Sequence, residues 1–221
     1  MRDRTDTLER KLHVLEQKLE PRSTFGGAEL MEVETVPASR NVTMVATHSD
    51  TEANQTFVVP LRLTEPINVY RLSFVAKKSQ ADAVASVAFA LYQGRPPALN
   101  RANPVESAFE LELFRVLGSA ELTDTNEKRY SITLDKELLV NPRVGYYFLG
   151  FQASGAKAKL LCPEFGFASG TMRSAWKTSS TGATTGDFAR SITTQSASTY
   201  VPYAVLRSFA GVRMFGGTED S

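Results

Sequence analysis

Apolar and polar side chains alternate repeatedly between residues 56 and 151, and this pattern constrains the fold more than any other feature of the sequence. A period of two is typical of strands that bury one face, because successive side chains point to opposite sides of a strand. The apolar members of the four runs are Phe57, Val59, Leu61 and Leu63; Tyr70, Leu72, Phe74 and Ala76; Phe109, Leu111 and Leu113; and Tyr130, Ile132 and Leu134. The runs predict consecutive antiparallel strands of one domain.

Two further segments, 84–92 and 146–151, are apolar on both faces. Strands of this kind are expected to be covered by a second sheet or by a neighbouring subunit. Gly- and Pro-containing turns punctuate the runs at 94–97, 141–142 and 154–155. Since no helical periodicity separates the strands, we expect a mainly β fold, an antiparallel β-sandwich or jelly-roll-like domain over 56–221.

The N-terminal segment has a different period. Its apolar stripe recurs at alternating steps of three and four residues and consists of Thr5, Leu8, Leu12, Leu15 and Leu19. This spacing predicts a coiled-coil helix over residues 1–20 that oligomerises or docks the chain, with Lys11 and Glu16 placed to pair between neighbouring helices. Pro21 ends the pattern. The alternative is an amphipathic helix that packs on its own domain. In either case, residues 21–55 are predicted to form a linker and the first short strands.

Residues 166–199 predict a long irregular excursion, because Ser, Thr, Gly and Ala make up 24 of the 34 residues. Trp176, the only tryptophan, lies inside it. One interpretation makes Trp176 an exposed platform for a glycan or a partner, joined by Tyr147, Tyr200 and Tyr203. The other makes it the anchor that holds the excursion against the sandwich.

Composition excludes several classes of function. The formal net charge is only +1, so the chain has no overall field to collect nucleic acid or an anionic membrane. The single cysteine, Cys162, excludes an intramolecular disulfide and a cysteine-rich zinc site, and we expect a buried, inert thiol. The charged N-terminus lacks the apolar stretch of a signal peptide, and no run is long enough to cross a bilayer, so we expect no membrane insertion.

Catalytic signatures are absent from the sequence. The two histidines, His13 and His48, do not form a recognisable pair, and no nucleophile-elbow, zinc-protease or phosphate-loop motif occurs. Two carboxylates flanking a cleft would serve a glycoside hydrolase, and the candidates are Glu110, Glu112, Asp124, Asp135 and Glu137. Charged residues on alternating strands are more often a solvated face, so we expect no enzyme activity, no cofactor and no metal.

Four segments carry a resemblance to a known family. They are 70–74, 87–92 followed by Gly94-Arg95-Pro96, 130–132, and 145–152 with its Gly-Tyr-Tyr-Phe-Leu-Gly order. Together they resemble a β-sandwich module of bacteriophage fibre and tail proteins, over about half of the chain. The resemblance implies a trimeric virion protein, made in the host cytoplasm, in which the module mediates assembly or contacts the host surface.

The leading hypothesis is therefore a homotrimeric phage virion structural protein: a fibre, tail or capsid-decorating appendage. Its expected partners are copies of itself and other virion proteins, reached through the N-terminal segment, and a host surface glycan is a further candidate. The alternative is a carbohydrate-binding adhesion module, and a glycoside hydrolase is the third hypothesis.

Overall fold

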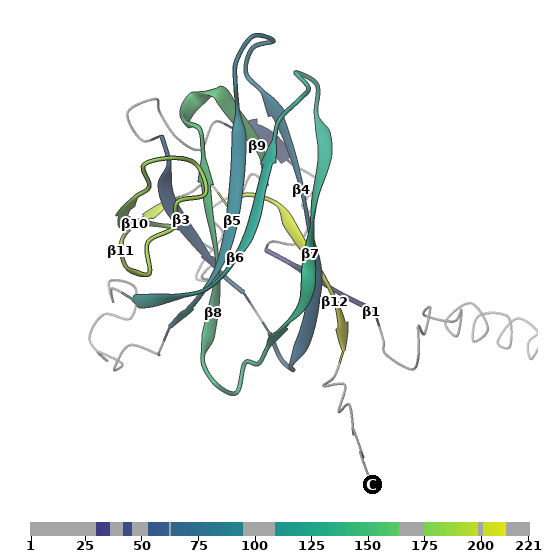
Figure 1. Cartoon of the computed structure of the whole chain (residues 1–221), viewed down its shortest axis with the longest axis vertical. Coiled ribbons are helices and arrows are strands. Elements are labelled where there is room, and N and C mark those ends of the chain that lie inside the picture. The colour runs from purple at the N-terminus through teal and green to yellow at the C-terminus, as the bar shows by residue number, and fades with distance from the viewer. Residues whose placement is uncertain are drawn as a thin grey trace, which may run out of the picture.

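A computed structural model describes residues 30–35, 42–45, 53–61, 63–94, 109–163, 175–198 and 201–210. These residues form twelve antiparallel strands in two layers, with one short 3-10 turn, Gly155–Lys157, between two of the strands (Figure 1). The mainly β, antiparallel prediction is confirmed. The predicted helix over 1–20 lies outside the described residues, which contain no α-helix.

One layer is an open six-stranded sheet. Its strands are β1 (Leu30–Glu34), β2 (Val42–Val45), β4 (Ile67–Lys78), β7 (Lys128–Val140), β9 (Ala158–Pro163) and β12 (Ala204–Ala210). The path runs β1-β12-β4-β9-β2, and β7 pairs with the other edge of β4. Strands β1 and β12 come from opposite ends of the described chain, so the fold closes by long-range pairing.

The other layer closes on itself. Its strands are β3 (Gln55–Pro60), β5 (Ser86–Gly94), β6 (Glu110–Glu121), β8 (Tyr146–Ala153), β10 (Ala175–Thr181) and β11 (Ser191–Ser198). They form a barrel in the order β10-β11-β6-β5-β8-β3. The expected sandwich is thus modified, because β10 pairs with β3 and β11 pairs with β6, so that this layer closes into a ring.

Strand β5 is buried on both faces, as its sequence predicted. Val87, Phe89 and Leu91 pack in the main core between the layers, where the Phe89 ring lies 4.8 Å from that of Phe74. Ala88, Ala90 and Tyr92 point into the barrel and pack with a second cluster that includes Phe188 and Ile192. Each large side chain buried in this way stabilises the fold by about 1.5–3 kcal/mol. The covering element belongs to the chain itself. The predicted segments are slightly too long, since Val84 and Tyr146 are exposed.

The Tyr92 ring fits inside the barrel because Gly150, diagonal to it on the neighbouring strand, has no side chain. Ala90 pairs with Gly150 on β8, and a Cβ atom at Gly150 would stand 2.8 Å from Cε2 of Tyr92. The Tyr92 hydroxyl donates a hydrogen bond to the carbonyl of Ala189 at 3.0 Å. Burial raises the pKa of Tyr92, so the hydroxyl keeps its proton.

The irregular excursion predicted over 166–199 is wrong for residues 175–181 and 191–198, which are strands β10 and β11. Threonine has a β-branched side chain that suits strands, so a segment rich in Ser and Thr can pair when a barrel supplies its neighbours. Tertiary pairing with β3 and β6 thereby overrides the low hydrophobicity of the segment.

Strand β4 departs from the predicted alternation at a bulge. The ladder with β7 shifts register between Val69 and Arg71. Ile67 and Val69 face the core before the shift, and Leu72, Phe74 and Ala76 face it afterwards. Tyr70 is consequently only half-buried and does not belong to the inward row in which the sequence pattern placed it.

Candidate interaction surface

Two buried glutamines, Gln55 and Gln152, make hydrogen bonds that join strands and loops of the barrel. Gln152 is fully buried; its Nε2 donates to Oγ1 of Thr56 and to the carbonyl of Asp187, both at 2.9 Å, and its Oε1 accepts from the amide of Gly186 at 2.8 Å. Gln55 holds β10, since its Nε2 donates to the carbonyls of Thr178 and Ser180 at 2.7 and 2.8 Å. Because these groups are bonded within the fold, we interpret them as structural.

Two of the four aromatic residues of the predicted glycan platform, Tyr147 and Tyr203, have described side chains, and these two lie in different layers. Tyr147 on β8 is only 4% exposed and packs edge-to-face against Phe114, with ring centroids 5.3 Å apart. Tyr203 precedes β12 in the other layer, and its hydroxyl donates to Oε1 of Glu34 at 2.9 Å. Trp176 lies in β10 opposite Val58 and Ala197. Tyr200 lies outside the described residues.

The predicted oligomerisation residues also lie outside the part of the chain that the structure describes. These are Thr5, Leu8, Lys11, Leu12, Leu15, Glu16 and Leu19. The pairing of Lys11 with Glu16 therefore stays a prediction.

The five carboxylates considered for hydrolysis are spread over two strands and a turn. Glu110 and Glu112 are exposed on β6, Asp135 and Glu137 are exposed on β7, and Asp124 lies in the turn between these strands. There the Asp124 carboxylate accepts a hydrogen bond from the amide of Asn126 at 3.0 Å. Among the described residues, no group of three His, Cys, Asp or Glu side chains could hold a metal ion.

Cys162 on β9 is 2% exposed, which confirms the predicted burial. Desolvation raises the pKa of its thiol from 9.0 to about 12, because an apolar environment disfavours the thiolate. The thiolate is the reactive form, so the predicted inertness has a physical basis, although reactivity itself stays a prediction.

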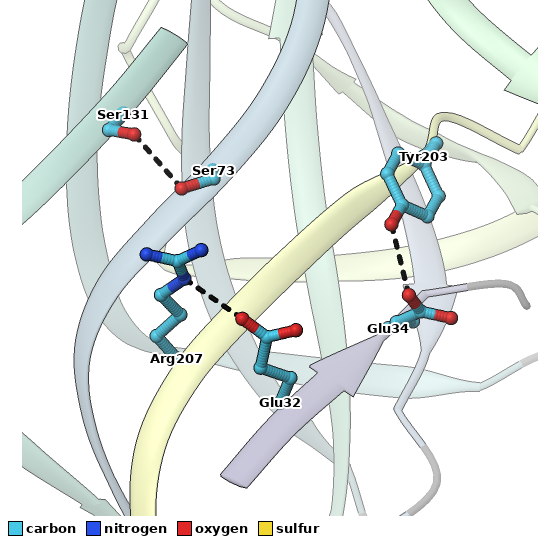
Figure 2. Close-up of polar contacts among 6 residues, drawn as sticks. All are labelled: Glu32, Glu34, Ser73, Ser131, Tyr203 and Arg207. Atoms are coloured by element: carbon cyan, nitrogen blue, oxygen red, sulfur yellow. Dashed lines mark hydrogen bonds and ion pairs between the residues drawn. The ribbon is translucent and has the colours of Figure 1, made fainter. Parts of the chain in front are cut away.

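The outward face of the open sheet carries a ladder of polar contacts between strands, drawn in Figure 2. Arg207 on β12 and Glu32 on β1 form an ion pair with Nε and Oε1 3.0 Å apart. The hydroxyls of Ser73 on β4 and Ser131 on β7 are 2.9 Å apart and share a hydrogen bond. We call this surface, with Glu34, Arg71, Thr133 and Tyr203, the outer polar face.

The ion pair between Arg207 and Glu32 lacks an aligned hydrogen bond. Nε of Arg207 is buried and has no aligned hydrogen bond, although Oε1 of Glu32 is only 3.0 Å away. The contact is therefore an ion pair without good hydrogen-bond geometry. In Figure 2 the terminal nitrogens of Arg207 lie away from Glu32, on the side of Ser73.

Tyr203 lies at the end of the outer polar face where its hydroxyl bonds to Glu34. Its pKa is raised first by burial and then by the hydrogen bond and negative charge of Glu34, while the positive charge of Arg129 lowers it. The hydroxyl therefore remains a donor to Glu34 beyond its ordinary range of pH.

Sequence reasoning placed Arg71 and Ser73 on the outward side of their strand but did not single out the outer polar face. Its pairs join residues that are 62 positions apart for Arg71 and Thr133, and 169 apart for Glu34 and Tyr203. Alternation gives the face of each strand, whereas register between distant strands decides which outward side chains meet.

Large apolar side chains are also exposed on the barrel side and around the turn before β8. Phe114 and Val116 on β6 are 38% and 43% exposed, and Val144 and Tyr146 are 67% and 60% exposed. Leu139 on β7 is 42% exposed. Scattered residues of this kind are common on soluble proteins, so they supply contact area without defining a site.

Comparison with known proteins gives little. No protein-family model matches the chain, and no curated protein matches it. A solved structure that is similar is described as "Crystal structure of the T13 IBDV viral particle reveals a missing link in icosahedral viruses evolution". The alignment covers 84% of this chain and 36% of that chain, with 10% identity and a TM-score of 0.30. The chain thus spans about a third of the protein that it matches.

A search of the described residues for a helix of membrane-spanning length and hydropathy finds none.

Proposed function

We propose that the chain is a structural subunit of a phage particle, a homotrimeric fibre, tail or capsid-decorating appendage that exposes the two-layered β-domain. The observation that best supports a structural role is the shared burial of β5 and β8, whose side chains fill the main core on one side and the barrel on the other. Such a domain is a rigid support, and its contacts with partners come from its surface.

The trimer is proposed from the apolar stripe at Leu8, Leu12, Leu15 and Leu19. Slightly more than two heptads form a marginal helix alone, because short helices gain most of their stability from packing. The β-domain therefore contributes to the contact between copies, and the exposed apolar residues of β6 and β7 offer area for it.

Light scattering after size exclusion tests the assembly. The full chain is expected at three times its mass of 24.3 kDa, about 73 kDa. Deletion of residues 1–20, or the pair Leu12→Ser and Leu15→Ser, is expected to shift the mass toward the monomer. The matched control is Arg10→Ser with Gln17→Ser, which changes the same helix outside the stripe. A monomeric full chain, unaffected by the deletion, contradicts the trimer.

The location in a particle needs a separate measurement. Mass spectrometry of purified virions is expected to recover peptides of this chain at a fixed ratio to the major capsid protein. Recovery only from the lysate and not from washed particles contradicts the virion assignment while leaving the oligomeric state untouched.

We also propose that the protein acts by binding and assembly and has no enzymatic activity. The five candidate carboxylates lie on separate strands and a turn, and Asp124 shapes that turn. Incubation with polysaccharide from the host surface is expected to release no reducing ends. Release that is lost in Glu110→Gln or Glu112→Gln would restore the glycoside hydrolase hypothesis.

A further inference from the structure

Two arginines lie side by side on the outer polar face. In the ladder between β12 and β4, Arg207 and Arg71 are direct partners. Side chains directly opposite each other in an antiparallel pair share one face, and like charges there destabilise the pair. The juxtaposition of two positive charges is unfavourable for the fold, which favours a role in recognition.

Only one of the two arginines, Arg207, forms an ion pair with a described carboxylate. Glu32 forms its ion pair with Arg207, whereas Arg71 donates from Nε to the neutral Oγ1 of Thr133 at 3.3 Å. Within the described residues, Arg71 has no carboxylate partner. One positive charge, together with the terminal N–H groups of Arg71, is left for a ligand.

Short polar side chains border the arginines. The next row of the face contains Ser73, which is only 4% exposed, and Ser131, which is exposed. Their hydroxyls are 2.9 Å apart and either can donate, so Ser131 can present a donor or an acceptor to a ligand. Glu34, two residues from Glu32 on the edge strand, adds a carboxylate acceptor beside the same rows. The face thus combines the guanidinium groups of Arg71 and Arg207 for an anion with hydroxyl and carboxylate groups for neutral hydroxyls. Figure 2 shows Arg207 with these hydroxyl and carboxylate groups.

The position of these strands narrows the class of ligand. Strand β12 pairs with β1 and β4, and β4 pairs with β12 and β7, so their backbone groups are used inside the sheet. A peptide that adds to a sheet needs an open edge, which the centre of this face does not provide. Recognition there depends on side chains alone.

We propose that Arg71 and Arg207 bind one anionic group, a carboxylate or a sulfate, of an acidic polysaccharide, and that the exposed Ser131 binds a hydroxyl of the same sugar. Guanidinium groups bind such oxyanions through paired hydrogen bonds. This site is independent of the proposed trimer, because all its residues belong to one chain.

Isothermal titration of the full chain with defined oligosaccharides tests the site. The probes are an oligogalacturonate for carboxylate, a heparin oligosaccharide for sulfate, and maltoheptaose as the neutral control. At least one acidic probe is expected to bind, and Arg71→Gln is expected to weaken it about tenfold or more, since charge-assisted hydrogen bonds are among the strong ones. Arg71→Lys is expected to restore only part of the affinity, because lysine keeps the charge but loses the planar fork.

Arg115→Gln is the matched control. Arg115 is an exposed arginine on β6 in the other layer, so its replacement removes the same charge from a different surface. An equal loss with Arg71→Gln and Arg115→Gln would show non-specific attraction and overturn the proposal. Binding of neither acidic probe above the level of maltoheptaose would overturn it as well. Equal affinity for a poly-glutamate peptide would overturn the assignment to a polysaccharide.

Discussion

Single residues decide how the barrel interior fits together. Gly150 leaves room for the ring of Tyr92, and Tyr92 in turn reaches the loop before β11 through its hydrogen bond to Ala189. A small residue on one strand and a large residue on its neighbour fill the interior to native density without strain.

We expect Gly150→Ala to destabilise the fold by about 1–3 kcal/mol, because the added methyl group would overlap the Tyr92 ring. Urea denaturation would measure the change. In Gly150→Ala with Tyr92→Leu, the cost of the alanine should fall, since the overlap is gone. If Gly150→Ala cost the same free energy of unfolding in the wild type and in the Tyr92→Leu variant, the packing explanation would be refuted.

The thiol of Cys162 should make stability depend on pH. The folded pKa of about 12 lies above the ordinary 9.0, so the unfolded chain releases this proton first as pH rises. The stabilising contribution is complete below pH 9 and decreases above it. Urea midpoints between pH 8 and 10 should fall more steeply for the wild type than for Cys162→Ala. Parallel curves for the two proteins would mean that the thiol titrates normally in the fold.

At the scale of elements, strands β10 and β11 close the barrel, and Gln152 forms hydrogen bonds with the loop between β10 and β11. The Gln152 amide joins Thr56 on β3 to Gly186 and Asp187 in that loop. A buried side chain with all its groups bonded fixes one arrangement of the elements around it.

Gln152→Leu should therefore cost about 2–4 kcal/mol, because it leaves buried donors and acceptors without partners. Hydrogen exchange should accelerate most at Gly186 and in β11, and less at the amides of β4 and β7, which exchange only when the whole domain unfolds. Gln80→Leu, at an exposed turn position, is the matched control and should leave both unchanged. Uniform acceleration across both layers would argue against a local fastening role.

The strands from β3 to β8 could be predicted because alternation and continuous apolar runs are local properties of the sequence. The burial of both faces of β5 followed from its continuous apolar run, and the structure adds that β10 and β11 form one of the two covers. That cover was missed because its Ser and Thr residues resemble a loop in composition, while its pairing partners are far away in sequence. The bulge after Val69 has no comparable local signal.

The outer polar face shows the same division between local and distant information. The outward position of Arg71 can be read from its strand alone. Its placement beside Arg207 depends on a register between strands that are more than 100 residues apart, which alternation does not encode.

At the scale of the whole molecule, the two cores share β5 and β8. A change that loosens either core reaches the other through the same strands, so the barrel and the open sheet should unfold together.

We expect one cooperative transition in urea, with coincident curves from far-ultraviolet and near-ultraviolet circular dichroism. Phe89→Ala, which removes a ring from the main core, should lower the midpoint by both probes through a loss of about 3–5 kcal/mol. Two separate transitions, with only one affected by Phe89→Ala, would show that the layers fold independently.

The pairing of β1 with β12 also determines how the domain responds to a pulling force. Leu30, where β1 begins, is opposite Phe209, close to where β12 ends, so the start of β1 and the end of β12 lie at the same end of the sheet. Tension applied between these segments would load the ladder at one end and break its hydrogen bonds one after another, as a zipper opens. Strand β1 would detach at low force while β4 and β7 remained paired. A domain held through both segments would therefore extend easily at β1 and resist extension in the rest of the open sheet.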